Sequence, residues 1–158
     1  MSSALTISRV LVLCVGNICR SPMAEVMLRD GFQKQGMAKV QVRSAGISTI
    51  DGRPADPNAQ RVLQNNGLDG SQHRSQRVAW KMIAWAELIL VMEDFQKQYI
   101  ESEFPEARGK VFLIGHWRRV QVPDPYRGNY SLFEASYQLL NQCSTDWVQR
   151  LSVALADA

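Results

Sequence analysis

Short runs of β-favouring residues alternate along the chain with longer segments in which apolar positions recur every three or four residues. The first pattern is typical of buried strands, and the second is typical of helices that cover a sheet. The short runs predict strands at residues 9–15, 40–44, 87–92 and 110–114. The longer segments predict helices at residues 21–35, 54–66, 75–85, 93–103 and 131–154.

Capping residues define several of these helix limits. Pro22 stands near the first position of the first helix, and Gly36 follows its end. Gly67 is expected to close the second helix, and Ser75 to cap the third. In the last helix, we expect one apolar face formed by Leu132, Ala135, Leu139 and Leu140.

Strands that alternate with helices predict right-handed crossovers and a parallel sheet covered on both faces. The chain has 158 residues, which suits one domain, and it shows no repeat or linker-like tract. The predicted fold class is therefore α/β, a single doubly wound domain over residues 1–158 with a four-stranded parallel sheet. Residues 1–7 are expected to be a flexible N-terminus.

Charge and composition argue against several function classes. The chain carries 18 basic and 15 acidic residues, a net charge of +3, without a long basic run, so no nucleic-acid partner is expected. No apolar run reaches the roughly 18 residues of a membrane span, and no basic export signal opens the chain. Three cysteines, two of them in one short motif, do not make a secreted disulfide framework. A cytoplasmic protein without membrane insertion is expected.

The first predicted strand runs directly into the segment Cys14-Val-Gly-Asn-Ile-Cys-Arg20, after which a helix begins. Ligands of such sheets bind beyond the carboxyl ends of the strands. A loop whose N–H groups point inward holds an anion, and the start of the next helix adds positive field. Arg20 adds a planar fork for two phosphate oxygens, and the same field stabilises a thiolate at Cys14. The remaining residues of this predicted phosphate-binding loop are Val15, Gly16, Asn17, Ile18, Cys19 and Ser21.

Simpler roles for the cysteines stay open at this point. Cys14, at a strand end, also fits a small buried hydrophobic residue. A metal bound by Cys14 and Cys19 lacks a second pair of ligands, so neither a metal nor a cofactor is expected. Cys19 either fills space beneath the loop or traps an oxidised Cys14 in a disulfide that reversibly switches the site off.

A proton donor is needed as well, and Asp124 is the leading candidate. It follows the fourth predicted strand, at the same edge of the sheet as the cysteine loop. Pro123 and Pro125 restrict the segment around it. The alternative is an aspartate that merely initiates a proline turn.

Together, these residues resemble the low-molecular-weight protein tyrosine phosphatase family, from about Arg9 to Leu151. The segment 14–25 looks like the phosphate-binding loop of that family, and 124–126 looks like its general-acid loop. The resemblance implies a phosphotyrosine phosphatase I-like fold and assigns Cys14 as nucleophile, Arg20 as phosphate clamp and Asp124 as general acid and base. It also implies that Ser44 and His73 support the loop together with Asn17 and Ser21. Glu93 stands where many relatives carry Asp.

The resemblance extends to the substrate rim, where it implies roles for Ile18, Ile50, Tyr126 and Arg127. Tyrosine-directed members carry a hydrophobic residue like Ile18, whereas arginine-phosphate-directed relatives carry Thr. Ile50 and Arg127 replace aromatic residues of other members, as in bacterial enzymes paired with tyrosine kinases of capsule and exopolysaccharide export. The expected partners are therefore a phosphotyrosine protein, in particular a tyrosine autokinase, and the expected state is a monomer or weak dimer.

Three other functions remain to be weighed. A thiol-dependent arsenate reductase of the same fold needs further redox cysteines, and only Cys143 is available downstream. A protein-arginine phosphatase is disfavoured by Ile18. A non-catalytic phosphotyrosine-binding module would be expected to lack Cys14, Arg20 or Asp124, and all three are present.

Overall fold

The computed structural model describes residues 7–156, so all of the predicted flexible N-terminus except Ile7 lies outside the described residues. Its centre is a sheet of four parallel strands in the order β2-β1-β3-β4. The strands are β1 (Arg9–Cys14), β2 (Gln41–Gly46), β3 (Leu88–Val91) and β4 (Val111–Leu113). The predicted α/β class with a four-stranded parallel sheet is confirmed.

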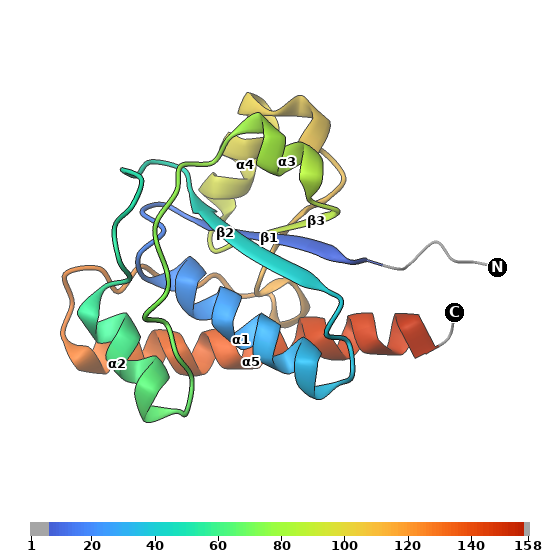
Figure 1. The fold of residues 1–158 in the computed structure, drawn as a ribbon. Helices are drawn as coiled ribbons and strands as arrows, with labels where there is room; N and C mark the ends of the chain where they lie inside the picture. Colours follow the sequence, from blue (N-terminus) through green and yellow to red (C-terminus); the bar gives the residue numbers. More distant parts are fainter. Residues whose placement is uncertain (1–6, 157–158) are drawn as a thin grey trace.

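Helices cover both faces of the sheet (Figure 1). One face carries α1 (Arg20–Lys34), α2 (Pro57–Asn65) and the long α5 (Tyr130–Ala156). The other carries α3 (Trp80–Trp85) and α4 (Asp94–Glu103). Short 3-10 turns at Pro105–Ala107 and His116–Arg118 flank β4.

Strand β1 joins the two halves of the core, because its side chains alternate between the two faces. Val10 and Val12 pack in the cluster with α1, α2 and α5, whereas Leu11 and Leu13 pack in the cluster with α3 and α4. All four are fully buried, and each such side chain contributes about 1.5–3 kcal/mol relative to an exposed one. The strand that ends in Cys14 is therefore held rigidly from both sides.

The order of the strands explains where the site lies. After β1, the chain crosses to β2 on one side and later to β3 on the other, so the direction of winding reverses at β1. Ligands of open α/β sheets bind at such a switch, outside the carboxyl ends of the strands. Cys14 is the last residue of β1, beside Gly46 at the end of β2.

Two predicted helix starts are wrong. The helix predicted from Pro54 begins at Pro57, because the Asp56 carboxylate accepts a hydrogen bond from the Asn58 N–H and caps it there. The helix predicted from Ser75 begins at Trp80. The Ser75 hydroxyl instead donates to the Ile50 carbonyl and accepts from the Arg53 N–H, so it joins two loops.

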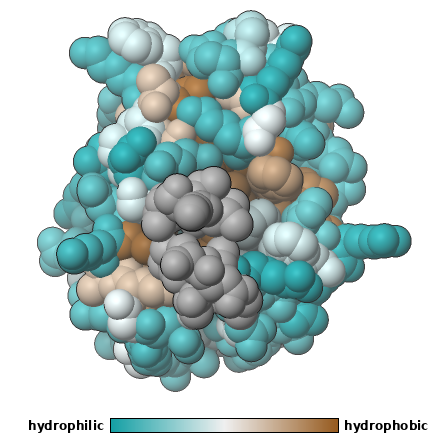
Figure 2. All heavy atoms as spheres, turned by 90° about the vertical axis from the view of Figure 1, so that its right-hand side faces the viewer, coloured by the Kyte–Doolittle hydropathy of each residue, from teal (hydrophilic) through white to brown (hydrophobic). Residues whose placement is uncertain are grey.

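The predicted apolar face of the last helix is also wrong in part. Leu132 and Ala135 are exposed, and the buried stripe runs one position later, through Phe133, Tyr137 and Leu140. No helix in the described part of the chain is long and apolar enough to cross a membrane. The face on which the strands begin is mostly hydrophilic, with hydrophobic residues in separate patches (Figure 2).

Candidate active site

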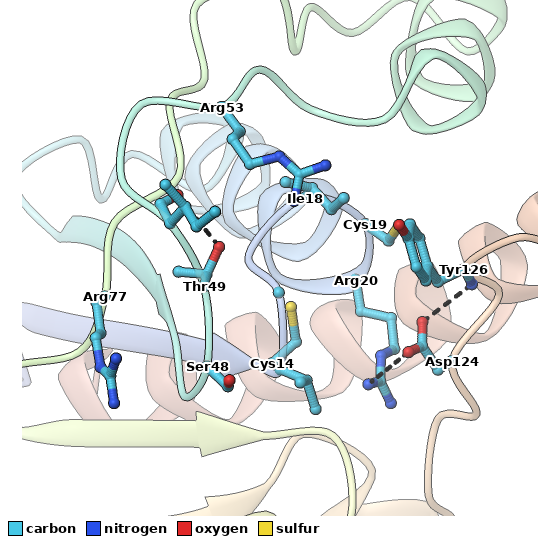
Figure 3. A pocket seen from close by; sticks show the side chains of 13 residues that line it. Cys14, Ile18, Cys19, Arg20, Ser48, Thr49, Arg53, Arg77, Asp124 and Tyr126 are labelled. Atoms are coloured by element: carbon cyan, nitrogen blue, oxygen red, sulfur yellow. Dashed lines mark hydrogen bonds and ion pairs between the residues drawn. The ribbon is translucent and has the colours of Figure 1, made fainter.

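A pocket of about 460 Å³ opens at the carboxyl end of β1. Its floor is the loop after β1, and one wall is the segment after β2, with Ser48, Thr49, Ile50 and Arg53. Figure 3 shows Cys14 between Arg77 on one side and Asp124 with Tyr126 on the other. Residues from four distant parts of the sequence therefore meet around one sulfur atom.

The Cys14 sulfur lies against hydrogen-bond donors. The N–H of Asn17 donates to Sγ at 3.2 Å, and the Ser21 hydroxyl lies 2.9 Å from it. The loop turns back on itself because Asn17 adopts a left-handed conformation, with φ of 56°. Asn tolerates this region better than most residues. Helix α1 then begins at Arg20, so its positive N-terminal end faces the loop.

Asn17 holds the shape of the loop through its side chain. Its Nδ2 donates to the hydroxyls of Ser21 at 2.8 Å and Ser44 at 3.0 Å. Its Oδ1 accepts the N–H of Gln76 at 2.9 Å. Nε2 of His73 donates to its backbone carbonyl at 2.6 Å, which requires the proton on Nε2. The loop is thus fixed by residues from β2 and from the segment before α3.

Glu25 extends this network, a role that the sequence analysis missed. Ser44 donates its hydroxyl hydrogen to Oε1 of Glu25 at 2.5 Å, and Nδ1 of His73 lies 3.9 Å from the same oxygen. Arg29 binds the other oxygen at 2.6 Å. Because the Ser44 proton points to Glu25, the Ser44 oxygen is left to accept from Asn17, which orients the whole chain of hydrogen bonds.

Arg20 is almost completely buried, with 1% of its side chain exposed, and its partners hold it in place. Nη1 donates to Glu93 at 2.5 Å and to the Val122 carbonyl at 2.8 Å, and Nη2 lies 3.7 Å from Asp124. Nε has no partner among the described residues. A buried donor of this kind is well suited to an anion in the pocket. Glu93 lies two residues after β3 and directly after the strand predicted at residues 87–92, so its position near the strand end is the signal that could have found its role.

Asp124 is the accessible carboxylate of the pocket, with 44% of its side chain exposed. Its Oδ1 accepts the N–H of Tyr126 at 3.0 Å, which fixes the carboxylate within its loop. Oδ2 faces Arg20. The group can therefore meet a substrate oxygen above Cys14 and exchange a proton with it.

The two loop cysteines differ in their surroundings. Burial, and then the nearby Asp56, raises the pKa of the Cys19 thiol far above its ordinary range. Cys19 thus stays protonated, while Cys14 lies at the floor of the pocket with donors around its sulfur. Both are unpaired, as is Cys143.

The predicted rim residues take different places. Ile18, Ile50 and Tyr126 line the pocket, with Ile50 72% exposed. Arg127 does not line the pocket itself, but its guanidinium lies 5.4 Å from the ring centroid of Tyr126, which does. Arg53 and Arg77 line the pocket and were missed, because no local pattern marks them.

The comparison with protein families settles the assignment. Residues 9–156 match the model of the low molecular weight phosphotyrosine protein phosphatase family. The chain belongs to this family. The predicted family and the predicted enzyme class, a protein-tyrosine-phosphatase, are thereby confirmed.

Individual relatives agree along nearly the whole chain. The probable low molecular weight protein-tyrosine-phosphatase EpsP of Ralstonia nicotianae is 41% identical over 92% of this chain and 97% of its own. The crystal structure of the tyrosine phosphatase Wzb from Escherichia coli K30 with sulphate superposes with a TM-score of 0.86 at 38% identity, covering 92% of this chain and 99% of that one.

The structure of a phosphatase named for a different substrate superposes equally well. The YwlE arginine phosphatase from Geobacillus stearothermophilus gives a TM-score of 0.87 at 30% identity, over 94% of this chain and 96% of its own. The overall fold therefore does not discriminate between a tyrosine phosphatase and an arginine phosphatase.

Proposed function

We propose that this enzyme hydrolyses phosphotyrosine in proteins through a phosphocysteine on Cys14. The observation that carries the proposal is the Cys14 sulfur beside the Asn17 N–H and the Ser21 hydroxyl, with the buried Arg20 fork next to it. Such donors stabilise a thiolate and the charge that develops on a transferring phosphoryl group.

In the first step, the Cys14 thiolate attacks phosphorus while Asp124 gives its proton to the departing phenolate oxygen. The sulfur–phosphorus bond forms as the phosphorus–oxygen bond to the tyrosine breaks. In the second step, Asp124 takes a proton from water, which attacks phosphorus and releases phosphate and the thiolate. The Ser21 hydroxyl, 2.9 Å from Sγ, stabilises the sulfur as it leaves.

Arg20 serves both steps as the phosphate clamp. Glu93 and the Val122 carbonyl hold one end of its fork, so little rotamer freedom is lost when the anion binds. The network of Asn17, Ser44 and His73 keeps the loop amides in place for the anion. No protein group other than Asp124 needs to move a proton.

Ile18 supports phosphotyrosine over phosphoarginine as substrate, because it lines the pocket with an apolar side chain. An aromatic ring buries apolar surface against such a side chain, whereas a guanidinium finds no hydrogen-bond acceptor on it. Arsenate reduction is disfavoured, because Cys143, the one cysteine downstream of the loop, is fully buried within α5 and does not line the pocket.

Ile50 and Arg127, which are similar to residues of bacterial members paired with tyrosine kinases, support a tyrosine autokinase of polysaccharide synthesis and export as the physiological substrate. A cytoplasmic location agrees with this, because a thiolate nucleophile needs a reducing compartment. A monomer or weak dimer stays a prediction.

Steady-state kinetics on phosphotyrosine, phosphoserine, phosphoarginine and arsenate test the proposal. We expect the highest kcat/KM on phosphotyrosine, and Ile18→Thr should narrow its advantage over phosphoarginine. A wild-type preference for phosphoarginine or arsenate would refute the proposed substrate. If Ile18→Thr kept the wild-type preference for phosphotyrosine over phosphoarginine, Ile18 would not determine the substrate.

A further inference from the structure

The pocket carries more positive charge than one phosphate requires. Of the three arginines that line it, Arg20 already has Glu93 as a partner at 2.5 Å. Arg53 and Arg77 form no ion pair with any carboxylate among the described residues. Asp124 is the one carboxylate among the lining residues. The rim therefore keeps an excess of positive charge beside the phosphate-binding loop.

The backbones that carry the two arginines are fixed. The N–H of Arg53 donates to the Ser75 hydroxyl at 3.0 Å, and its carbonyl accepts the Ser75 N–H at 2.7 Å. Arg77 forms a parallel bridge with Gly46, and its N–H donates to Asp51 at 2.8 Å. Each arginine thus extends from a well-held segment, although its own side chain is exposed.

These segments are also hydrogen-bonded to the phosphate-binding loop itself. The Ser48 N–H donates to the Val15 carbonyl at 2.9 Å, and the Gln76 N–H donates to Oδ1 of Asn17 at 2.9 Å. Consequently, the backbone at both arginines keeps a set position relative to a phosphate above Cys14, and the exposed side chains extend from it. In Figure 3, Arg77 lies on the side of Cys14 away from Asp124 and Tyr126.

We propose that Arg53 and Arg77 form a second anion-binding area, which selects phosphotyrosines that have an anionic group close by in the sequence. This inference rests on the proposed function. In an extended peptide, the residues one and two positions from the phosphotyrosine lie about 3.3–7 Å away along the chain. A carboxylate or a second phosphate at these positions offers the paired oxygens that a guanidinium binds best.

General electrostatic steering is the rival explanation. Exposed arginines raise the association rate of any anionic substrate, whatever residues flank its phosphate. Steering alone would therefore increase kcat/KM equally for all phosphotyrosine peptides of the same net charge. A specific anion-binding area instead favours charges placed next to the phosphotyrosine over the same charges placed farther away.

The test measures kcat/KM on four phosphotyrosine peptides. One has glutamates next to the phosphotyrosine, one has the same glutamates at its far end, one has flanking glutamines, and one has a flanking phosphoserine. The enzymes are wild type, Arg53→Gln, Arg77→Gln and the double variant. Arg108→Gln is the matched control, because Arg108 is exposed and precedes β4, at the opposite edge of the sheet.

We expect wild type to prefer at least one adjacent anion over flanking glutamine by about five- to twentyfold, since exposed pairs contribute about two- to fivefold each. In each single variant, the ratio of kcat/KM with an adjacent anion to kcat/KM with flanking glutamine should fall by about two- to fivefold, and in the double variant it should fall nearly to one. Arg108→Gln should keep the wild-type ratio. The glutamate and phosphoserine peptides show which anion the area binds.

Equal kcat/KM of wild type on adjacent and distant glutamates, with no gain from phosphoserine, would overturn the inference. A preference that survives in the double variant would overturn it as well. Both results leave hydrolysis of the glutamine peptide intact, so the proposed function would stand. If wild type hydrolysed no phosphotyrosine peptide, the proposed function itself would fail.

Discussion

Asn17 offers the sharpest test of how the phosphate-binding loop is held. Its side chain is fully buried and makes three hydrogen bonds, to Ser21, Ser44 and the backbone of Gln76. Asn17→Ala removes all three and leaves buried polar groups without this partner. It also places an alanine at φ of 56°, a region that disfavours a Cβ.

The expected loss of stability follows from these contacts. Hydrogen bonds contribute about 0.5–1.5 kcal/mol each, so three account for about 1.5–4.5 kcal/mol. The left-handed backbone adds about 1 kcal/mol for alanine. We therefore expect Asn17→Ala to lower the free energy of unfolding by about 4 kcal/mol. Asn17→Gly loses the same hydrogen bonds, but glycine adopts the left-handed backbone without a steric cost. It should therefore be more stable than Asn17→Ala by about 0.5–1 kcal/mol.

Equilibrium unfolding in urea measures these differences, provided that the slope against denaturant stays constant between variants. Asn141→Ala is the matched control, because Asn141 lies on the exposed side of α5 and should change stability by less than about 0.5 kcal/mol. A loss below about 1 kcal/mol in Asn17→Ala would refute the reasoning. Equal stability of the alanine and glycine variants would show that the left-handed backbone at residue 17 adds nothing to the loss.

Three further predictions concern chemistry and pH. Asp124→Asn should lose about 10²–10⁴ in kcat/KM on phosphorylated phenols of ordinary pKa and much less on a strongly acidic phenol, because kcat/KM reports the step in which the phenol leaves; an equal loss of kcat/KM on both would mean that Asp124 positions the substrate. After peroxide and then dithiol, wild type should regain activity and Cys19→Ser should not, if Cys19 traps the sulfenic acid of Cys14 as a disulfide; equal recovery refutes this. A hydrogen bond from the Ser8 N–H holds the pKa of Glu87 below its ordinary value. The resulting stabilisation is complete above the ordinary glutamate pKa of about 4.3 and is lost as pH falls below it, so Glu87→Gln should flatten the dependence of stability on pH in the acid range, and an unchanged profile would refute this.

Local patterns in the sequence were enough to predict the sheet, because the strands are buried on both faces and read as apolar runs. The cysteine loop was equally accessible, since Cys14, Asn17 and Arg20 are close in sequence and follow a strand directly. The helix starts that were predicted wrongly depend on tertiary contacts. Ser75 is a good N-cap by type, but its hydroxyl is used by Ile50 and Arg53.

Three site residues that sequence reasoning left without a role share one property. Arg53 and Arg77 line the pocket, and Glu93 binds Arg20, from segments that only the folded sheet brings together, and no motif marks their spacing. Arg53 lies between β2 and α2, Arg77 lies between α2 and α3, and Glu93 lies two residues after β3. A polar residue just beyond a predicted strand is therefore a signal that could have found Glu93, whereas only tertiary contacts bring Arg53 and Arg77 to the pocket.

The central claim is that phosphate passes through Cys14, and one measurement tests it directly. Wild type and Asp124→Asn are mixed with an excess of a phosphorylated, strongly acidic phenol, quenched within milliseconds and analysed by peptide mass spectrometry. Because loss of the general base slows hydrolysis of the intermediate, we expect one phosphate on Cys14, accumulating more in Asp124→Asn than in wild type. Phosphate on Ser21 or another residue, or rapid turnover by Cys14→Ser, would contradict the account.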